Sequence, residues 1–437
     1  MSNPQNGGTT LADHEGSKPR RGLAARPGVN ASLLLAHVPF VLLLTVLAPM
    51  ILPREGVGDT FFFWYAGHLT VAGGSPYDQN DWASAGAAYG VFAKNVALTC
   101  SPSPYQPTCL WTYPPTTAFV FAPFGLLNVR DGVYALTMFT FMTTAASVIA
   151  VGQWMGARLL ATRSLALCSI AVSNPFLFDI NAGHFEGLGV FGILLIAVGL
   201  TRRRVAPVAA GALLLSMKPH LYAGLAVVVL LLLVTRRDWR TLGWSLGVVA
   251  TANGLALLRF PEAPGEIIWR AGQIRDVGWA TTSAFGSHLF SSPLVGVAIM
   301  YGIAALAFAV AVRFAPAERK TDALVAAGAA LGLCFSPYAH PYDYLGLAPA
   351  FALALALGGS VGQPVRGILL VATAGTIAFG TWLAIAGSAI VTALPGTLPV
   401  VILALLGVAA WAAQRRTAAG FTGTATSAQG SAGSSRP

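Results

Sequence analysis

The sequence predicts an all-α polytopic membrane protein. Of its 437 residues, 55% are hydrophobic and only 10% are charged, and the mean hydropathy is +0.67, whereas soluble proteins carry about 25% charged residues. The apolar residues form long runs, and arginines and lysines cluster between these runs, as the positive-inside rule predicts for cytoplasmic loops. The net charge of +10 is therefore not a sign of nucleic-acid binding.

The two ends of the chain predict tails around one transmembrane domain. Residues 1–28 are polar and basic, and residues 417–437 are rich in Gly, Ser, Thr and Ala, so we expect disordered cytoplasmic tails. The run Ala31–Leu52 is too long for the core of a cleaved signal peptide and lacks a good cleavage site. We therefore expect a first transmembrane helix there, and a single membrane domain over residues 29–416.

The arginine clusters decide which of the apolar runs cross the membrane. A span needs about 20 apolar residues, and the run 115–127 is short and broken by prolines. The clusters alternate correctly only if this run does not cross, so we expect an interfacial or re-entrant segment. The result is 12 spans with both termini cytoplasmic and with large outer loops at 53–131 and 259–291. The runs after the first helix are 115–127, 132–156, 161–179, 186–201, 205–217, 220–235, 241–258, 292–314, 322–337, 342–358, 366–390 and 395–414.

The first outer loop opens with an aromatic stretch, Gly58–Asp78, that predicts an amphipathic helix. Asp59 lies at the start of this helix, just past the first span. It is either an N-cap or a general base at the rim of a cavity. The two roles are compatible, because a helix N-terminus keeps a carboxylate ionised.

Tyrosines and tryptophans crowd the same loop. An aromatic belt at the membrane interface accounts for most of them. Sugars, however, pack their C–H faces on aromatic rings and bond phenol hydroxyls. Tyr65, Tyr77 and Tyr113 are therefore candidate ligands of a sugar or an acceptor; Tyr77 lies in GGSPYD and Tyr113 in WTYPP, both of which predict turns.

Three basic residues on the outer side are candidates for binding an anion. Lys218, in LLLSMKPH, is held in a short turn between two apolar runs. It is either a snorkelling lysine or the partner of a phosphate near the bilayer surface. Arg270 and Arg275, in the second large loop, are weaker candidates for the same donor or for a lipid headgroup.

Two histidine segments lie at other outer turns. His184 and Glu186, in GHFEG, either cap a helix or belong to a site, and a metal would need more ligands of fixed geometry. His340, in CFSPYAHPYDYLG, lies at a break between two spans, which is tolerated where the backbone lines a cavity. We expect His340 and Asp59 to face one cavity, where the imidazole would donate a hydrogen bond that orients the carboxylate.

The cysteines do not suggest a metal site. Cys100 and Cys109 lie in the first outer loop, where they form either a disulfide in an oxidising compartment or two free thiols. The sequence has no CxxC motif or Cys/His cluster.

Four motifs in order resemble a known family. The stretch GDTFFFWYAGHLTVAGGSPYD resembles the D-x-x-x-Y-x-x-A…G-x-x-P-Y signature of the polyprenol-phosphate-mannose-dependent α-mannosyltransferases of glycosyltransferase family 87. WTYPPTTAFVFAPFGLL, LLLSMKPH and CFSPYAHPYDY resemble its Y-x-Y-P-P, K-P and S-P…H-x-Y segments. Order and spacing agree over roughly residues 31–415, and the sequence departs at GHFEG, where the family more often has G-Q-x-N.

The resemblance implies a GT-C fold in the cytoplasmic membrane, with juxtamembrane helices in the outer loop and an extracytoplasmic active site. It matches the family's catalytic aspartate to Asp59, which would deprotonate an acceptor hydroxyl and lead to inversion at the anomeric carbon. The donor would be a polyprenyl-phosphate sugar, usually mannose, and the acceptor a glycolipid or glycan; no metal or other cofactor is expected. A secondary transporter and a non-catalytic polysaccharide-assembly or flippase subunit remain alternative interpretations.

Overall fold

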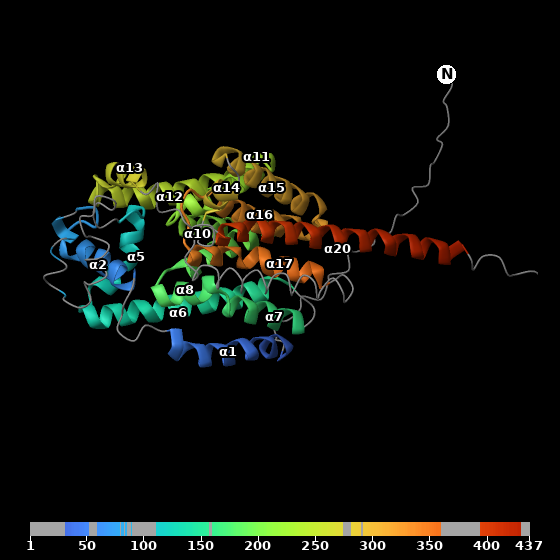
Figure 1. Cartoon of the computed structure of the whole chain (residues 1–437), viewed down its shortest axis with the longest axis horizontal. Coiled ribbons are helices and arrows are strands. Elements are labelled where there is room, and N and C mark those ends of the chain that lie inside the picture. The colour runs from blue at the N-terminus through green and yellow to red at the C-terminus, as the bar shows by residue number, and fades with distance from the viewer. Residues whose placement is uncertain are drawn as a thin grey trace, which may run out of the picture.

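The computed structural model is built of helices throughout its described part, as the composition predicts (Figure 1). It describes residues 31–51, 59–78, 80–82, 84, 89, 111–156, 160–273, 281–289, 292–359 and 394–429. The α-helices and 3-10 helices (η) are, in order, α1 (Ala31–Ile51), α2 (Asp59–Ala72), α5 (Pro115–Gly125), α6 (Val129–Trp154), α7 (Leu160–Ala171), α8 (Asn174–Ala182), α9 (Glu186–Arg202), α10 (Val205–Leu215), α11 (Pro219–Thr235), α12 (Trp239–Arg259), α13 (Ala263–Gln273), α14 (Thr282–Leu289), α15 (Pro293–Phe314), η3 (Ala317–Arg319), α16 (Lys320–Phe335), η4 (Pro341–Leu347), α17 (Ala348–Gly358), η5 (Leu394–Thr397) and α20 (Leu398–Gln429).

Four helices in the described part are long and apolar enough to cross a membrane. They are α6, α12, α15 and the Leu398–Arg416 portion of α20. Helices α7 and α8 form a fifth if they are taken as one span bent by 49°. The count of 12 spans stays a prediction, since several expected runs form shorter helices and the run 366–390 lies outside the described residues.

The short run 115–127 forms the 11-residue helix α5. A helix of this length is about 16 Å long, roughly half the thickness of a bilayer's hydrocarbon core. Pro115 occupies its first turn, where the missing N–H costs nothing, and Pro123 lies inside it. The length agrees with the expectation that this run does not cross the membrane by itself.

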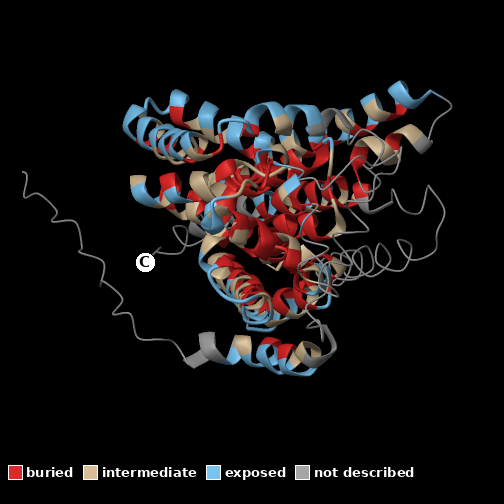
Figure 2. Ribbon diagram, turned by 90° about the vertical axis from the view of Figure 1, so that its left-hand side faces the viewer, coloured by how far each residue is buried: buried red, intermediate tan, exposed pale blue. Residues whose placement is uncertain are grey.

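The interior of the bundle is packed with small residues, and its outside is apolar. Figure 2 shows the buried residues concentrated in the centre and the exposed ones on the outer helices. A Cβ atom added to Gly224 of α11 would lie 2.6 Å from the backbone nitrogen of Gly332 in α16, so these helices cross backbone to backbone. Large apolar side chains such as Leu258 and Leu294 are 81% and 83% exposed, as lipid-facing residues would be.

A second core joins α2, α5 and the turn after α2. We call it the aromatic cluster. Its large buried side chains are Phe61, Phe63, Trp64, Tyr65, Tyr77, Trp82, Trp111 and Phe121. Helices α2 and α5 cross at two glycines: a Cβ on Gly67 would lie 2.2 Å from the carbonyl oxygen of Phe121, and a Cβ on Gly125 would lie 2.2 Å from the backbone nitrogen of His68. This close crossing fixes the direction of α2 and therefore the position of Asp59 at its start.

The C-terminal end differs from the sequence prediction. Helix α20 continues to Gln429, so residues 417–429 are helical where a disordered tail was expected. This stretch has several alanines and no proline to stop the helix. Residues 1–28 and the pair Cys100 and Cys109, for which a tail and a possible disulfide were predicted, lie outside the described residues.

The crossing of α2 and α5 generates a stability prediction. We expect Gly67→Ala to destabilise the folded protein by about 1–3 kcal/mol, because the added methyl group meets backbone that must move. The matched control is Gly243→Ala in α12, where a Cβ would meet nothing within 4 Å and where alanine should be neutral or stabilising, by up to about 1 kcal/mol. Thermal unfolding in detergent measures both. Equal midpoints for the two variants would show that the crossing is not tight.

Candidate active site

Four segments converge at one end of the bundle and carry the polar residues that the sequence singled out. These segments are the start of α2, the α8–α9 turn, the start of α11 and the α16–η4 loop. They bring together Asp59, His184, Lys218 and His340, which span 281 positions in the sequence. The structure thus places Asp59 and His340, which were expected to face one cavity, in the same region of the bundle.

The α8–α9 turn depends on a glycine. Helix α8 ends at Ala182, and Gly183 adopts φ 76°, a left-handed conformation that favours glycine. A Cβ at this position would lie 1.8 Å from Oγ1 of Thr60. The turn therefore lies directly against the first turn of α2, and the next side chain, His184, reaches Asp59.

His184 and Asp59 form the pair closest to the surface of the site. Nε2 of His184 lies 2.7 Å from Oδ2 of Asp59, and the two side chains are 2% and 45% exposed, respectively. The imidazole stacks on the ring of Tyr342, with centroids 3.6 Å apart, and meets the ring of Phe63 edge-on at 5.1 Å. The histidine is thus buried and held in place, while the carboxylate is half open.

The Asp59 carboxyl is ionised at neutral pH. Burial raises its pKa, whereas the hydrogen bond from His184 and the positive charge of Lys218 lower it. The net pKa lies below the ordinary value for aspartate. Within the described part of the chain, Oδ1 of Asp59 has no hydrogen-bond partner. Asp59 therefore presents a charged oxygen atom that can accept a proton.

Lys218 lies deeper, between two carboxylates. Its Nζ donates to Oε2 of Glu186 at 2.9 Å and to Oδ1 of Asp343 at 2.7 Å, and all three side chains are at most 4% exposed. The rings of Phe185 and Tyr342 lie 4.9 and 5.1 Å from the ammonium nitrogen. We call Lys218, Glu186 and Asp343 the buried triad.

The buried triad changes the interpretation of two predicted site residues. Lys218 was expected to be open to a phosphate, and Glu186 to a sugar or acceptor. In the structure Lys218 donates a hydrogen bond to Glu186, and Glu186 also accepts a hydrogen bond from the hydroxyl of Tyr222. The sequence could not predict this contact, because Lys218 and Glu186 are 32 positions apart and meet only through the packing of α9 and α10.

His340 also has partners that the sequence did not indicate. Its Nε2 lies against the hydroxyl of Tyr338, and its backbone N–H donates to Oδ2 of Asp343 at 2.7 Å. Burial lowers the pKa of His340 to about 4, so this histidine is neutral at pH 7. The imidazole found hydrogen-bonded to Asp59 is that of His184, although His340 is near enough to Asp59 to interact with it electrostatically.

The three predicted tyrosines fall into two groups. Tyr65 and Tyr77 are 3% and 1% exposed. Their hydroxyls donate to the backbone carbonyls of Asp81 and Tyr113, each at 2.7 Å. They hold together the segment that follows α2, which differs from the predicted sugar contact. Tyr113 itself is partly exposed, and its ring packs against those of Phe63 and Phe185, 5.5 Å from each, beside the His184 turn.

Sequence reasoning gave no role to Asp179. Its carboxylate is fully buried, accepts a hydrogen bond from the hydroxyl of Thr144 at 2.6 Å, and accepts another from the backbone N–H of Glu186 at 3.0 Å. Its carbonyl accepts the N–H of His184 at 2.8 Å. Asp179 therefore fixes the turn that carries both His184 and Glu186. An acidic residue inside the apolar stretch NPFLFDINA was the available signal.

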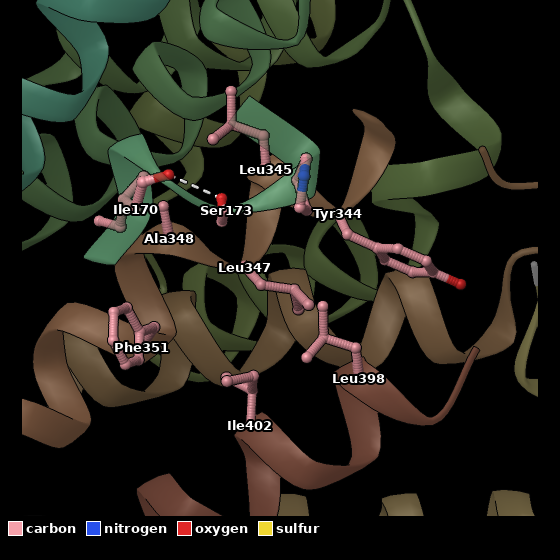
Figure 3. Close-up of a pocket in the computed structure, with 10 residues that line it drawn as sticks. Ile170, Ser173, Tyr344, Leu345, Leu347, Ala348, Phe351, Leu398 and Ile402 are labelled. Carbon is pink, nitrogen blue, oxygen red and sulfur yellow. Dashed lines mark hydrogen bonds between the residues drawn. The ribbon is translucent and has the colours of Figure 1, made fainter. Parts of the chain in front are cut away.

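A small apolar cavity lies behind η4 (Figure 3). Its volume is about 30 Å³, room for roughly one water molecule, so it cannot hold a sugar. The residues that line it come from the α7–α8 bend, from η4 and α17, and from α20; they are Ile170, Ser173, Pro175, Tyr344, Leu345, Leu347, Ala348, Phe351, Leu398 and Ile402. Asp59 is not among these residues, so this cavity is separate from the candidate site.

The structure gives no side-chain contacts for the two arginines that were predicted to bind the donor. Arg275 lies outside the described residues, and of Arg270 only the backbone, in α13, is described. Among the described residues, no group of three or more His, Cys, Asp or Glu side chains is arranged to hold a metal ion.

One comparison with known proteins identifies a family. No curated protein and no solved structure showed a significant match. The model of glycosyltransferase family 87 matches residues 111–337, just over half of the chain, and this span contains Tyr113, His184, Glu186 and Lys218. Together with the apolar helices, the match shows that the chain belongs to glycosyltransferase family 87 and is a membrane glycosyltransferase.

Proposed function

We propose that the protein transfers a sugar from a polyprenyl-phosphate donor to a hydroxyl of a glycolipid or glycan, with Asp59 as the general base and inversion at the anomeric carbon. One observation carries this proposal. Asp59 is ionised, half exposed, held through Oδ2 by a buried histidine, and open at Oδ1. A base must begin ionised and must lie within hydrogen-bond reach of the proton it takes.

In the proposed reaction, one bond to the anomeric carbon forms while another breaks, and Asp59 takes up one proton. Oδ1 of Asp59 takes the proton from the acceptor hydroxyl, while the hydroxyl oxygen forms a bond to the anomeric carbon of the donor sugar. The bond from that carbon to the phosphate oxygen breaks, and the polyprenyl phosphate leaves with the electron pair. The attack comes from the face opposite the leaving group, which inverts the configuration. Tyr113, beside the site, is the tyrosine best placed to contact either sugar.

The phosphate is the part of the donor that the site must compensate electrostatically. Among the described residues of the site, the acidic side chains of Asp59, Asp179, Glu186 and Asp343 outnumber the one ammonium group, that of Lys218. A phosphate contact by Lys218 would require the lysine to share its hydrogen bonds with the phosphate. Arg270 and Arg275, after α12, remain candidates for the additional positive charge. Mannose, the sugar that the family resemblance suggests, is the first sugar to test.

The helix directions support an extracytoplasmic active site in the cytoplasmic membrane. Helices α9 and α11 begin at the site, and α16 ends near it. Their other ends carry Arg202–Arg204, Arg236 and Lys320, and Arg236 donates to the hydroxyl of Thr321 at 2.9 Å. Because positive clusters mark the cytoplasmic side, the site should face the other side.

Substitution of Asp59 tests its role as the general base. We expect Asp59→Asn to lower kcat by about 10²–10⁴-fold, the usual cost of losing a general base, with the protein still folded. The matched control is Asp131→Asn, an exposed aspartate in the first turn of α6. Purified protein in lipid would be given radiolabelled polyprenyl-phosphate sugars and a panel of glycolipid acceptors. Near-normal transfer by well-folded Asp59→Asn would remove the assignment and favour a transporter or a non-catalytic assembly subunit.

Substitution of Lys218 distinguishes a structural role from a phosphate contact. Removing it leaves two buried carboxylates without their cation, so we expect Lys218→Met to destabilise the protein by about 3–5 kcal/mol. Adding Glu186→Gln and Asp343→Asn to that variant removes the charges as a unit and should restore much of the loss. Lys320→Met, at the exposed start of α16, is the control. Thermal unfolding and the donor KM are measured together: an unchanged unfolding midpoint with a raised donor KM would instead indicate a phosphate ligand.

A further inference from the structure

His184 combines two features that together define how it can act on Asp59. Its Nε2 lies 2.7 Å from the carboxylate, whereas its Nδ1 is buried and has no hydrogen-bond partner in the described part of the chain. An ionised carboxylate only accepts hydrogen bonds, so Nε2 must carry the proton of this contact. The neutral tautomer then leaves Nδ1 as a bare lone pair.

The doubly protonated form of His184, the imidazolium, fits this environment poorly. An imidazolium would place an N–H donor at Nδ1, where the described structure offers no acceptor. A buried donor without a partner carries the full penalty of its lost hydration. Tyr342 stacks on the ring, and Phe63 packs against it at a right angle, so the imidazole cannot turn to find a partner without leaving its stack.

The ring is also fixed from the backbone side. The N–H of His184 donates to the carbonyl of Asp179 at 2.8 Å, and Gly183 before it is locked against Thr60. A fixed donor 2.7 Å from Oδ2 determines where Oδ1 points. Misplacing a reacting group by about 1 Å can cost on the order of 10²-fold in rate.

We propose that His184 is a positioning residue, which holds Asp59 through a single neutral Nε2–H donor and neither relays nor stores the proton. This inference rests on the proposed role of Asp59 as the base. After the transfer, the proton of the acceptor hydroxyl stays on Asp59 and leaves from its exposed side. A merely structural histidine would not affect the reaction through Asp59, and a relay would need a second partner at Nδ1.

The test uses the geometry of two amides. The side-chain nitrogen of glutamine can occupy the place of imidazole Nε2, whereas that of asparagine reaches only the place of Nδ1. We therefore expect His184→Gln to keep most of the wild-type kcat and His184→Asn to lose on the order of 10²-fold. Substrate KM values should stay near wild type in both, because His184 does not touch the substrates.

Two further measurements separate positioning from other roles. His184→Asn added to Asp59→Asn should cost nothing more, since a residue that acts only through Asp59 has no effect once the base is gone. Independently of activity, ¹⁵N-histidine NMR of the full-length protein should show an Nε2–H tautomer that disappears in His184→Gln. Thermal unfolding checks that each variant is folded.

The outcomes are distinct. If transfer depends on Asp59 but His184→Asn is as active as wild type, or His184→Gln is as impaired as His184→Asn, the positioning role is wrong and the proposed function stands. An imidazolium or Nδ1–H signal for His184 would also overturn the inference. If the wild type transfers no sugar but the NMR shows the Nε2–H tautomer, the proposed function fails while the pairing remains.

Discussion

The ammonium group of Lys218 is the interaction on which the candidate site depends. It lies at the start of α11 and holds Glu186, the first residue of α9, together with Asp343 of η4. Three segments distant in sequence therefore meet at one nitrogen atom. A buried ion pair is rarely a source of net stability compared with apolar packing, but losing one member is costly. The triad thus makes any arrangement that separates these segments unfavourable.

The ring of Tyr342 connects the two parts of the site, the Asp59–His184 pair and the buried triad. Tyr342 stacks on His184 and also lies 5.1 Å from the ammonium of Lys218. The buried triad is closed to solvent, whereas the other part carries the half-exposed Asp59 carboxylate. The buried triad therefore holds the segments in place, and Asp59 is left available for the proposed chemistry. A site on loops alone would hold its reacting group less accurately.

Sequence reasoning located the site more accurately than it located the contacts within it. Hydropathy and the arginine clusters identified the helical class, and Asp59, Lys218 and His340 were all singled out from their places at the ends of apolar runs. Their partners could not be predicted, because pairing depends on how helices pack: Asp59 meets His184, and Lys218 meets two carboxylates. Tyr77 seemed open because turns are usually exposed, yet its hydroxyl is bonded within the aromatic cluster. Backbone crossings such as that of Gly67 leave no periodic signal.

The lengths of α9 and α11 bear on the membrane around the site. Each helix has 17 residues, which corresponds to about 25 Å, a few ångströms less than the roughly 30 Å of a bilayer's hydrocarbon core. With arginines at headgroup level on one side, the other ends of these helices, at Glu186 and Lys218, would lie below the opposite headgroups. A bilayer meets such a mismatch by thinning locally. The protein would then present the half-exposed Asp59 carboxylate in a water-accessible depression of the leaflet on that side, at the depth where the phosphate of a lipid lies.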